Sequence, residues 1–169
     1  MRAVCIMVMG PSGVGKTTTA KAIANALNWT FAEGDEFHPA SNIAKMSAGI
    51  PLDDQDRQPW LETIRDWMTQ KSKEGVNTVI TCSALKRRYR DILQGTEADL
   101  RFLQLDAPVQ LVGERMSRRS DHYMPLSLLN SQFDALEPLQ SDENGIVISV
   151  EENPEQVVSA ALQALAPNI

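Results

Sequence analysis

The residues with the clearest chemical meaning form a glycine-rich segment near the N-terminus. Residues 10–17 read GPSGVGKT and match the pattern GxxxxGK[ST], directly after the apolar run of residues 4–9. In such a loop the backbone N–H groups and the start of the next helix point at phosphate oxygens. Lys16 would reach the β and γ phosphates, and the Thr17 hydroxyl could hold Mg²⁺. The segment therefore predicts a site for nucleotide phosphates.

A second group of chemically useful residues follows the second predicted strand. Asp35 could accept a hydrogen bond from an attacking hydroxyl and either orient it or take its proton, and His38 could donate to an acceptor oxygen. Phosphoryl transfer needs such contacts, because the reaction depends on the position of the acceptor hydroxyl more than on covalent chemistry by the protein. The spacing fits equally well a loop in which Asp35 caps the next helix and His38 is solvated.

The third predicted strand is followed by Ser83 and Lys86, which would place a hydroxyl and a cation beside the phosphate loop. No carboxylate ends that strand. If the third strand lies next to the strand that precedes the phosphate loop, Mg²⁺ would be held by Thr17, phosphate oxygens and water. Any carboxylate would then contact these ligands and not the ion itself. Asp106 ends the fourth strand, but it fits as well as a helix cap before Pro108.

The basic residues are unevenly distributed. Half of the sixteen Lys and Arg residues lie between positions 86 and 119. Such a cluster in an acidic chain is typical of local handling of a small anion, although a solvated helix face explains single members equally well. The arginines up to Arg119 precede a polar loop, which suits a hinged lid over the phosphates. Which arginine enters the site is open at this stage.

The elements that must position these residues follow from periodicity. Short apolar runs alternate with longer segments of helical period, which is typical of βαβ units and a parallel sheet. We expect strands at 3–9, 29–32, 78–82, 100–105 and 146–150. We expect helices at 16–27, at 59–73 with Pro59 in the first turn, and after a cap at Asn153. This predicts one α/β domain over 1–169, with an acceptor-binding insertion at about 34–57 and a lid at about 117–144.

Composition narrows the class of protein. The net charge of −6 argues against nonspecific nucleic-acid binding, which usually needs a basic excess. No stretch approaches the ~18 continuous apolar residues that cross a bilayer, and the phosphate loop begins too early for a cleaved signal, so we expect a cytoplasmic protein without a membrane partner. Cys5 and Cys82 lie in predicted strands, where core packing is expected.

The chain closely resembles the gluconate kinases over nearly its whole length. These small phosphate-loop enzymes use ATP to phosphorylate D-gluconate on its 6-hydroxyl. The resemblance rests on an ordered set of segments that is far more specific than the phosphate loop: GDEFHP at 34–39, NIAKM at 42–46, GIPLDDQDR at 49–57, PWL at 59–61, CSALK at 82–86, YRD at 89–91, then Arg119, His122, SQ at 131–132 and LE at 136–137.

The resemblance implies a three-layer fold like that of the nucleoside monophosphate kinases, with a parallel sheet of about five strands, flanking helices and a helical lid, in a homodimer. It implies ATP and Mg²⁺ as cofactors, with Thr17 as metal ligand. The ATP-binding residues would be Gly10, Pro11, Ser12, Gly13, Val14, Gly15, Lys16, Thr17, Thr18 and Arg115.

The resemblance also assigns roles at the acceptor end. Lys16, Asp35 and Arg119 become catalytic candidates, with Asp35 as general base or hydroxyl-orienting group. The gluconate-binding candidates are Asp35, His38, Arg57, Lys86 and His122, with Arg57 as the preferred partner of the carboxylate. Two local departures from the family pattern are Tyr123, where Phe is frequent, and Ala32-Glu33, where an apolar residue followed by Asp is commoner.

Other readings keep the same phosphate loop. Shikimate, adenylylsulfate or a nucleoside monophosphate could be the acceptor, because enzymes for all three share this loop and topology. The segments 35–45 and 53–86 favour gluconate. A regulator that binds ATP without turnover is a different class, and the intact Lys16, Thr17, Asp35 and Arg57 count against it. A nucleotide-dependent nucleic-acid module fits the net charge poorly.

Overall fold

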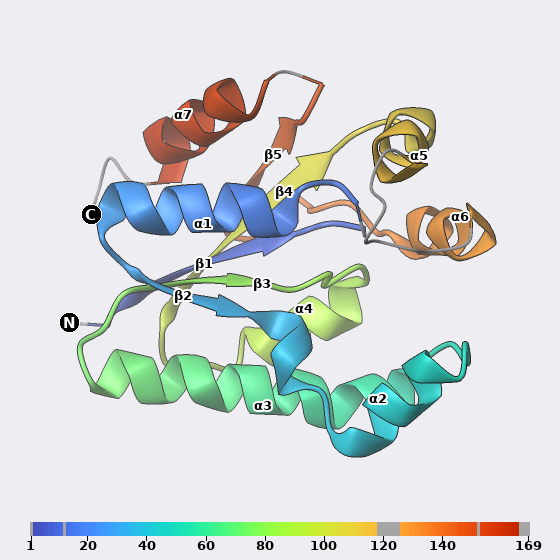
Figure 1. The fold of residues 1–169 in the computed structure, drawn as a ribbon. Coiled ribbons are helices and arrows are strands. Elements are labelled where there is room, and N and C mark those ends of the chain that lie inside the picture. The colour runs from blue at the N-terminus through green and yellow to red at the C-terminus, as the bar shows by residue number, and fades with distance from the viewer. Residues whose placement is uncertain (1, 12, 118–125, 152, 166–169) are drawn as a thin grey trace.

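The computed structural model describes residues 2–11, 13–117, 126–151 and 153–165, which fold around one parallel sheet (Figure 1). The strands are β1 Val4–Met9, β2 Thr30–Glu33, β3 Thr78–Thr81, β4 Asp99–Asp106 and β5 Gly145–Ser149. The helices are α1 Lys16–Leu27, η1 Gly34–Phe37 (a 3₁₀ turn), α2 Ala40–Ser47, α3 Asp54–Lys73, α4 Arg87–Leu93, α5 Val109–Ser117, α6 Leu126–Ala135 and α7 Pro154–Leu165.

All pairings within the sheet are parallel, in the strand order β2-β3-β1-β4-β5. This confirms the predicted parallel α/β sheet of five strands. The chain moves from β1 to one side of the sheet and returns across β1 to reach β4, so β1 is the point at which the winding direction changes. Ligands of open parallel sheets bind beyond the carboxyl ends of the strands at such a point. The glycine-rich loop leaves the carboxyl end of β1.

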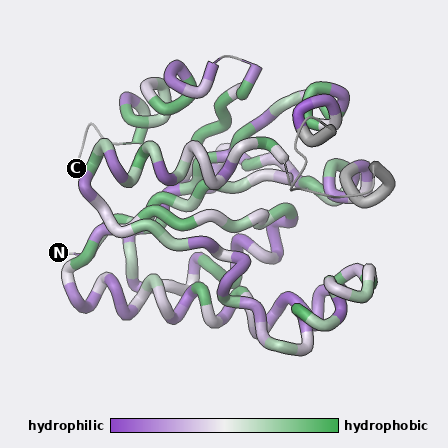
Figure 2. The backbone as a smooth tube through the Cα atoms, in the orientation of Figure 1, coloured by the Kyte–Doolittle hydropathy of each residue, from purple (hydrophilic) through white to green (hydrophobic). Residues whose placement is uncertain are grey.

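Helices cover both faces of the sheet (Figure 1). Along β1, Ile6 and Val8 face a buried cluster that includes α1 and α7, whereas Cys5, Met7 and Met9 face a second cluster with α3 and α4. This alternation follows from the two-residue period of a strand. Because both faces are covered, the strands are apolar over most of their length, as the tube in Figure 2 shows.

Of the three helices that periodicity predicts, those at 16–27 and after Asn153 agree with the structure, whereas α3 begins earlier than expected. The helix does not begin at Pro59 but at Asp54, where Asp53 and Asp56 form a reciprocal capping box. Pro59 thus lies inside the helix. The cap satisfies two otherwise unpaired backbone N–H groups, which favours the earlier start. At α7 the Asn153 side chain accepts from the Gln156 backbone, so the predicted cap is confirmed.

Both cysteines are buried, as predicted, and burial raises the pKa of each thiol to about 12. They pack as small apolar side chains in the second cluster. Within the described ranges, none of the helices combines the length and the apolar character that a membrane crossing requires.

Candidate functional site

The glycine-rich loop adopts a backbone that only glycine accommodates well. Gly10, Gly13 and Gly15 have φ of 141°, 81° and 98°, in the region that side chains disfavour. Gly15 is the N-cap of α1 and offers no side chain to cover the first N–H groups of that helix. Those donors therefore remain available for an anion at the helix N-terminus. Gly10 N donates to Ser83 O at 3.2 Å, which ties the loop to the segment after β3.

Lys16 is folded over the loop that it follows. Its Nζ donates to Gly10 O at 2.7 Å and to Pro11 O at 3.3 Å. Burial lowers the pKa of Lys16, and the negative charges of Asp35 and Glu33 act in the opposite direction. The ammonium group is thus held at the loop, close to the carboxylates at and just after the end of β2.

Glu33 is a functional candidate that the sequence analysis noted only as a departure from the family pattern. Its carboxylate accepts from Thr17 Oγ1 at 2.6 Å and from Thr81 Oγ1 at 3.1 Å. The pairing of β2 with β3 brings it there, because Glu33 lies opposite Thr81 in the register. A carboxylate therefore does lie beside the proposed metal ligand, but it comes from β2 rather than β3. The sequence does not give the order of the strands in the sheet, and this contact depends on that order.

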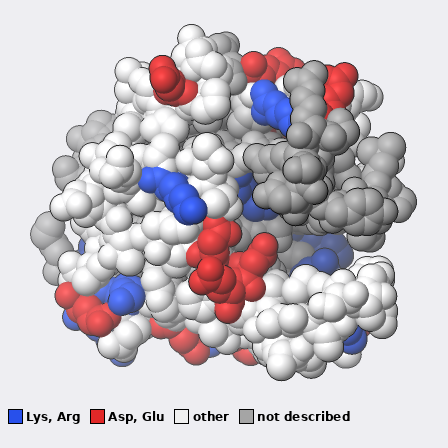
Figure 3. Space-filling view, in the orientation of Figure 1, with Lys and Arg blue, Asp and Glu red and all other residues white. Residues whose placement is uncertain are grey.

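The residue after Glu33 fixes the direction of the chain into η1. A Cβ on Gly34 would lie 2.0 Å from Thr81 O, so only glycine fits between β2 and β3 here. The Gly34 carbonyl accepts from Trp60 Nε1 at 2.7 Å. Asp35 follows with an 83% exposed side chain. Figure 3 shows acidic side chains gathered near the middle of the face, where β2 runs into η1, beside a hollow that contains basic side chains.

His38 is held rigidly next to Asp35. Its side chain is 4% exposed, and its ring stacks on Trp60 with centroids 4.2 Å apart. His38 Nε2 lies 3.9 Å from Asp35 Oδ1, which is too long for a hydrogen bond. Burial lowers the pKa of His38, Asp35 counteracts this, and Arg57 adds to it. The structure thus contradicts the alternative in which His38 is solvated.

Arg57 lies beside Tyr89, which links α4 to the start of α3. Arg57 Nη1 donates to Leu52 O at 2.6 Å and to Tyr89 Oη at 3.2 Å. The Tyr89 hydroxyl donates to Asp54 Oδ1 at 2.5 Å. Both Arg57 and Lys86 pack over the Tyr89 ring, at 5.5 and 5.7 Å from its centroid. The predicted cations Arg57 and Lys86 are therefore brought together around one tyrosine, which the sequence placed in the YRD segment without a role.

Asp54 balances part of this positive charge. Its carboxylate also pairs with Arg88 and lies 3.5 Å from Lys86 Nζ. The hydrogen bond from Tyr89 and the charges of Lys86 and Arg88 hold the pKa of Asp54 below its usual value, against some desolvation. Burial and the contact with Asp54 raise the pKa of Tyr89 to about 12, so its hydroxyl stays protonated and donates. Asp54 thus pairs with Lys86 and Arg88, whereas Arg57 reaches it only through the Tyr89 hydroxyl.

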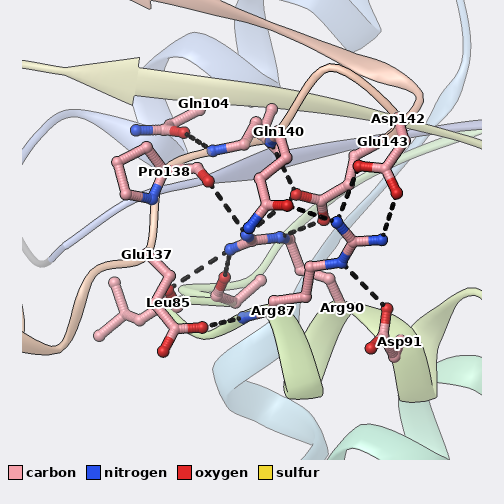
Figure 4. A network of polar contacts seen from close by, with 12 residues as sticks. Leu85, Arg87, Arg90, Asp91, Gln104, Glu137, Pro138, Gln140, Asp142 and Glu143 are labelled. Carbon is pink, nitrogen blue, oxygen red and sulfur yellow. Dashed lines mark hydrogen bonds and ion pairs between the residues drawn. The ribbon is translucent and has the colours of Figure 1, made fainter.

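Arg90 supports the segment that carries Lys86 (Figure 4). Its side chain is fully buried and pairs with Glu143, with Nε 2.6 Å from Oε1. Its Nη1 donates to Ala84 O at 2.9 Å, and Ala84 has a φ of 43°, a conformation unusual for a residue other than glycine. The buried guanidinium therefore holds a strained turn between β3 and Lys86.

The same region anchors part of the segment predicted as a lid. Glu137 N donates to Leu85 O at 2.7 Å, and its carboxylate accepts from Arg87 N at the start of α4. Arg87 also forms a two-point pair with Asp142 (Figure 4). Residues 137–143 are thus tied to α4.

The remaining candidates have different environments. Val14 is buried in the core, and Thr18 is exposed on α1. Arg115 Nη2 donates to Val150 O at 2.9 Å, so the described contact of this residue is with backbone after β5. Ser12, Arg119 and His122 lie outside the described residues.

Comparisons with known proteins cover almost the whole chain. The family model for shikimate kinase matches residues 12–166. The gluconokinase of Gluconobacter oxydans (strain 621H) is 44% identical over 158 residues, which are 94% of this chain and 89% of that protein. The thermosensitive gluconokinase of Escherichia coli (strain K12) is 48% identical over 141 residues, which are 83% of this chain and 75% of that protein.

Solved structures give the same picture. A sugar kinase from Janibacter sp. HTCC2649 is 48% identical and has a TM-score of 0.92, with coverage of 98% of this chain and 96% of that chain. A gluconokinase from Sinorhizobium meliloti 1021 is 41% identical and has a TM-score of 0.87, with coverage of 96% and 91%. The matched regions therefore extend over both the phosphate loop and the acceptor side.

Proposed function

The chain belongs to the gluconokinases, within the wider group that the shikimate kinase model describes, and from this we propose that it transfers the terminal phosphoryl group of ATP to the 6-hydroxyl of D-gluconate. The observation that carries the proposal is the clustering of Arg57 and Lys86 around Tyr89, on the acceptor side of a phosphate loop. A sugar acid offers one carboxylate for such a cluster and hydroxyls for Asp35 and His38.

The reaction needs few steps from the protein. The bond between the terminal phosphorus and the oxygen that bridges it to the β phosphate breaks, and a bond from the gluconate 6-oxygen forms. The hydroxyl proton leaves to Asp35 or to solvent through it. Lys16 and the first N–H groups of α1 stabilise charge on the phosphoryl oxygens. The products are ADP and 6-phospho-D-gluconate.

The described residues suit Mg²⁺ bound mainly through the nucleotide. Thr17 Oγ1 is the candidate direct ligand, and Glu33 accepts a hydrogen bond from it. Mg²⁺ usually keeps several waters and takes one or two protein oxygens besides phosphate. When bound, the ion would neutralise charge shared by the β and γ phosphates. Within the described ranges, no group of three or more His, Cys, Asp or Glu residues is arranged to hold a metal by itself.

At the acceptor end, Arg57 and Lys86 would bind the carboxylate of gluconate by charge-assisted hydrogen bonds. Asp35 and Arg57 both affect the pKa of His38, in opposite directions, which suits a position of His38 between the reacting hydroxyl and the carboxylate. Arg115, Arg119 and His122 stay candidates for a lid over the phosphates. We also infer a homodimer from the family resemblance, which light scattering of the purified protein would test, and we keep the cytoplasm as the expected location.

The direct test is ADP production by the purified protein with Mg²⁺-ATP and D-gluconate, run beside shikimate, adenylylsulfate and nucleoside monophosphates. We expect turnover with gluconate and a product phosphorylated at the 6-position. Turnover with shikimate in its place would favour the second candidate function, which the name of the matched family model suggests. ATP binding without turnover on any acceptor would favour a regulator.

A further inference from the structure

A buried polar residue on α2 contacts the histidine of the candidate site. Asn42 is 1% exposed, and its Nδ2 lies 2.8 Å from Asp56 O and 3.1 Å from His38 Nδ1. Asp56 O is a backbone carbonyl and only accepts hydrogen bonds. The atom that faces it must therefore be the amide nitrogen, which settles the orientation of the Asn42 amide.

The same nitrogen determines the state of His38. Because Asn42 Nδ2 is a donor only, His38 Nδ1 must be the acceptor in the contact between them. A neutral imidazole with an accepting Nδ1 carries its proton on Nε2. Nε2 is also the nitrogen that faces Asp35.

The surroundings keep this arrangement rigid. The His38 ring stacks on Trp60, which is itself 2% exposed and bonded to the Gly34 carbonyl. The backbone of Asp56 belongs to the capped start of α3, and its carboxylate pairs with Lys45 of α2 at 2.8 Å. Asn42 therefore bridges two elements that are already fixed to each other, and neither of its partners is free to turn away.

The distance between His38 and Asp35 leaves room for an oxygen atom. Nε2 and Asp35 Oδ1 are 3.9 Å apart, so one hydroxyl oxygen could lie within about 2.8 Å of both. Such a hydroxyl would accept from Nε2–H and donate to the carboxylate. The charged groups that act on His38 are Asp35 and Arg57, and burial opposes protonation of the ring.

We propose that Asn42 is a positioning residue that fixes His38 as the Nε2–H tautomer, so that His38 donates to a substrate hydroxyl and proton acceptance is left to Asp35. The substrate part of this inference rests on the proposed function, whereas the tautomer does not. The division of labour follows from hydrogen-bond capacity alone: an Nε2 that carries a proton cannot act as a base toward the same hydroxyl.

The first test is the tautomer itself, measured by two-bond ¹⁵N–¹H correlation on the uniformly ¹⁵N-labelled protein without a histidine tag. The chain holds two histidines, so the signals that disappear in His38→Gln belong to His38. We expect the Nε2–H pattern in the wild type at pH 7.5, with and without gluconate. An Nδ1–H pattern, an averaged pattern or a protonated ring would overturn the proposal.

The second test changes Asn42. Asn42→Ala removes the donor, and Asn42→Asp replaces it with an acceptor of the same size. We expect mixed tautomers in the first variant and a protonated Nδ1 in the second, with a KM for gluconate raised about three- to tenfold and the KM for ATP unchanged. Asn25→Ala, at an exposed position on α1, is the matched control, and thermal melting checks that each variant folds.

The outcomes separate the two proposals. An unchanged His38 tautomer in folded Asn42 variants would reject the role of Asn42. If the wild type does not phosphorylate gluconate at all, the proposed function fails. An Nε2–H tautomer that is lost in the Asn42 variants would still support the role of Asn42 in fixing His38. Should both Asn42 variants fail to fold, the wild-type spectrum alone still decides the tautomer.

Discussion

The two sides of the candidate site are built in different ways. The phosphate side consists of one continuous segment from β1 through the glycine-rich loop into α1, and its donors are largely backbone N–H groups. The acceptor side combines η1, α2, the start of α3 and the start of α4, and its groups are side chains that hold one another. Tyr89, for example, contacts Arg57 and Asp54, more than thirty positions earlier in the chain.

The two sides should therefore respond differently to amino-acid substitutions. A backbone donor survives most substitutions around it, so the phosphate side depends on glycines and on Lys16. A side-chain network transmits each loss to its neighbours, so the acceptor side should show graded and coupled effects.

Removal of the loop lysine should have the largest effect on turnover. Lys16→Ala should lower kcat by about 10³-fold, because a preorganised charge near the transferred group contributes on this scale. The fold should persist, since the hydrogen bonds of Lys16 Nζ to described residues go to loop carbonyls. Discontinuous assays of ADP formation would measure the loss of turnover. Lys21→Ala, at an exposed position on α1, is the control. Near-normal turnover would reject the assignment.

Asp35→Asn should reduce kcat by about 10²-fold or more, with a smaller change in the KM for gluconate, because the carboxylate is proposed to act on the proton of the reacting hydroxyl. Glu36→Gln offers a matched control, since Glu36 is an exposed neighbour on the same 3₁₀ turn. Steady-state kinetics on both variants would suffice. Equal effects of the two substitutions would mean that only the local charge matters.

Arg57→Ala should raise the KM for gluconate about 10- to 100-fold and leave the KM for ATP nearly unchanged, since a charged hydrogen bond of about 1.5–3 kcal/mol is lost. Arg65→Ala, further along α3, is the control, because Arg65 pairs with the exposed carboxylate of Asp66. Unchanged gluconate kinetics would exclude Arg57 as the carboxylate partner.

Tyr89→Phe should give a smaller effect of the same kind. The variant loses the hydroxyl that links Asp54 to Arg57 and keeps the ring beneath the two cations, so we expect a two- to tenfold rise in the KM for gluconate. Combined with Arg57→Ala, the effect should be less than additive. Full additivity would show that Tyr89 does not act through Arg57.

The smallest effect on turnover near neutral pH should come from the buried pair of Arg90, on α4, with Glu143. The quantity to measure there is the free energy of unfolding. Burial works to raise the pKa of Glu143, but hydrogen bonds from Arg90 and Gln140 hold it below its ordinary value of 4.5. A lowered pKa contributes stability above pH 4.5 that disappears as the pH falls through the lower value of the folded state.

Urea unfolding between pH 7 and pH 3 would test this. The wild type should lose stability steeply below pH 4.5, whereas Glu143→Gln should be less stable at pH 7 by about 3 kcal/mol and should lose less on acidification. Glu97→Gln, in an exposed pair with Lys73, should follow the wild type. Parallel curves for the wild type and Glu143→Gln would contradict the prediction.

The contrast between the two sides also explains what the sequence could predict. The glycine-rich loop, the strand periods and the helix at 16–27 are local patterns, and the structure confirms them. The start of α3 differs from the expected one because the capping pair Asp53 and Asp56, and not Pro59, determines where the helix begins. Local composition could not reveal Glu33 beside Thr17, because that contact depends on the strand order.

On the acceptor side, family resemblance supplied the candidates Asp35, His38, Arg57 and Lys86 before any contact was known. It did not supply their supports. Asn42, Tyr89 and Arg90 are buried polar residues whose partners come from other elements, and periodicity describes such positions only as interior. A motif that contains polar residues at buried helix positions is the signal that could have identified them.

The central claim is that a positive cluster on the acceptor side selects a sugar acid. The most direct measurement compares kcat/KM for D-gluconate and D-glucitol under the same Mg²⁺-ATP conditions, because the two chains differ only in a carboxylate or a CH₂OH group at one end. We expect gluconate to be preferred by about 10- to 100-fold, the scale of a charged hydrogen bond. Equal values for the two compounds would contradict it.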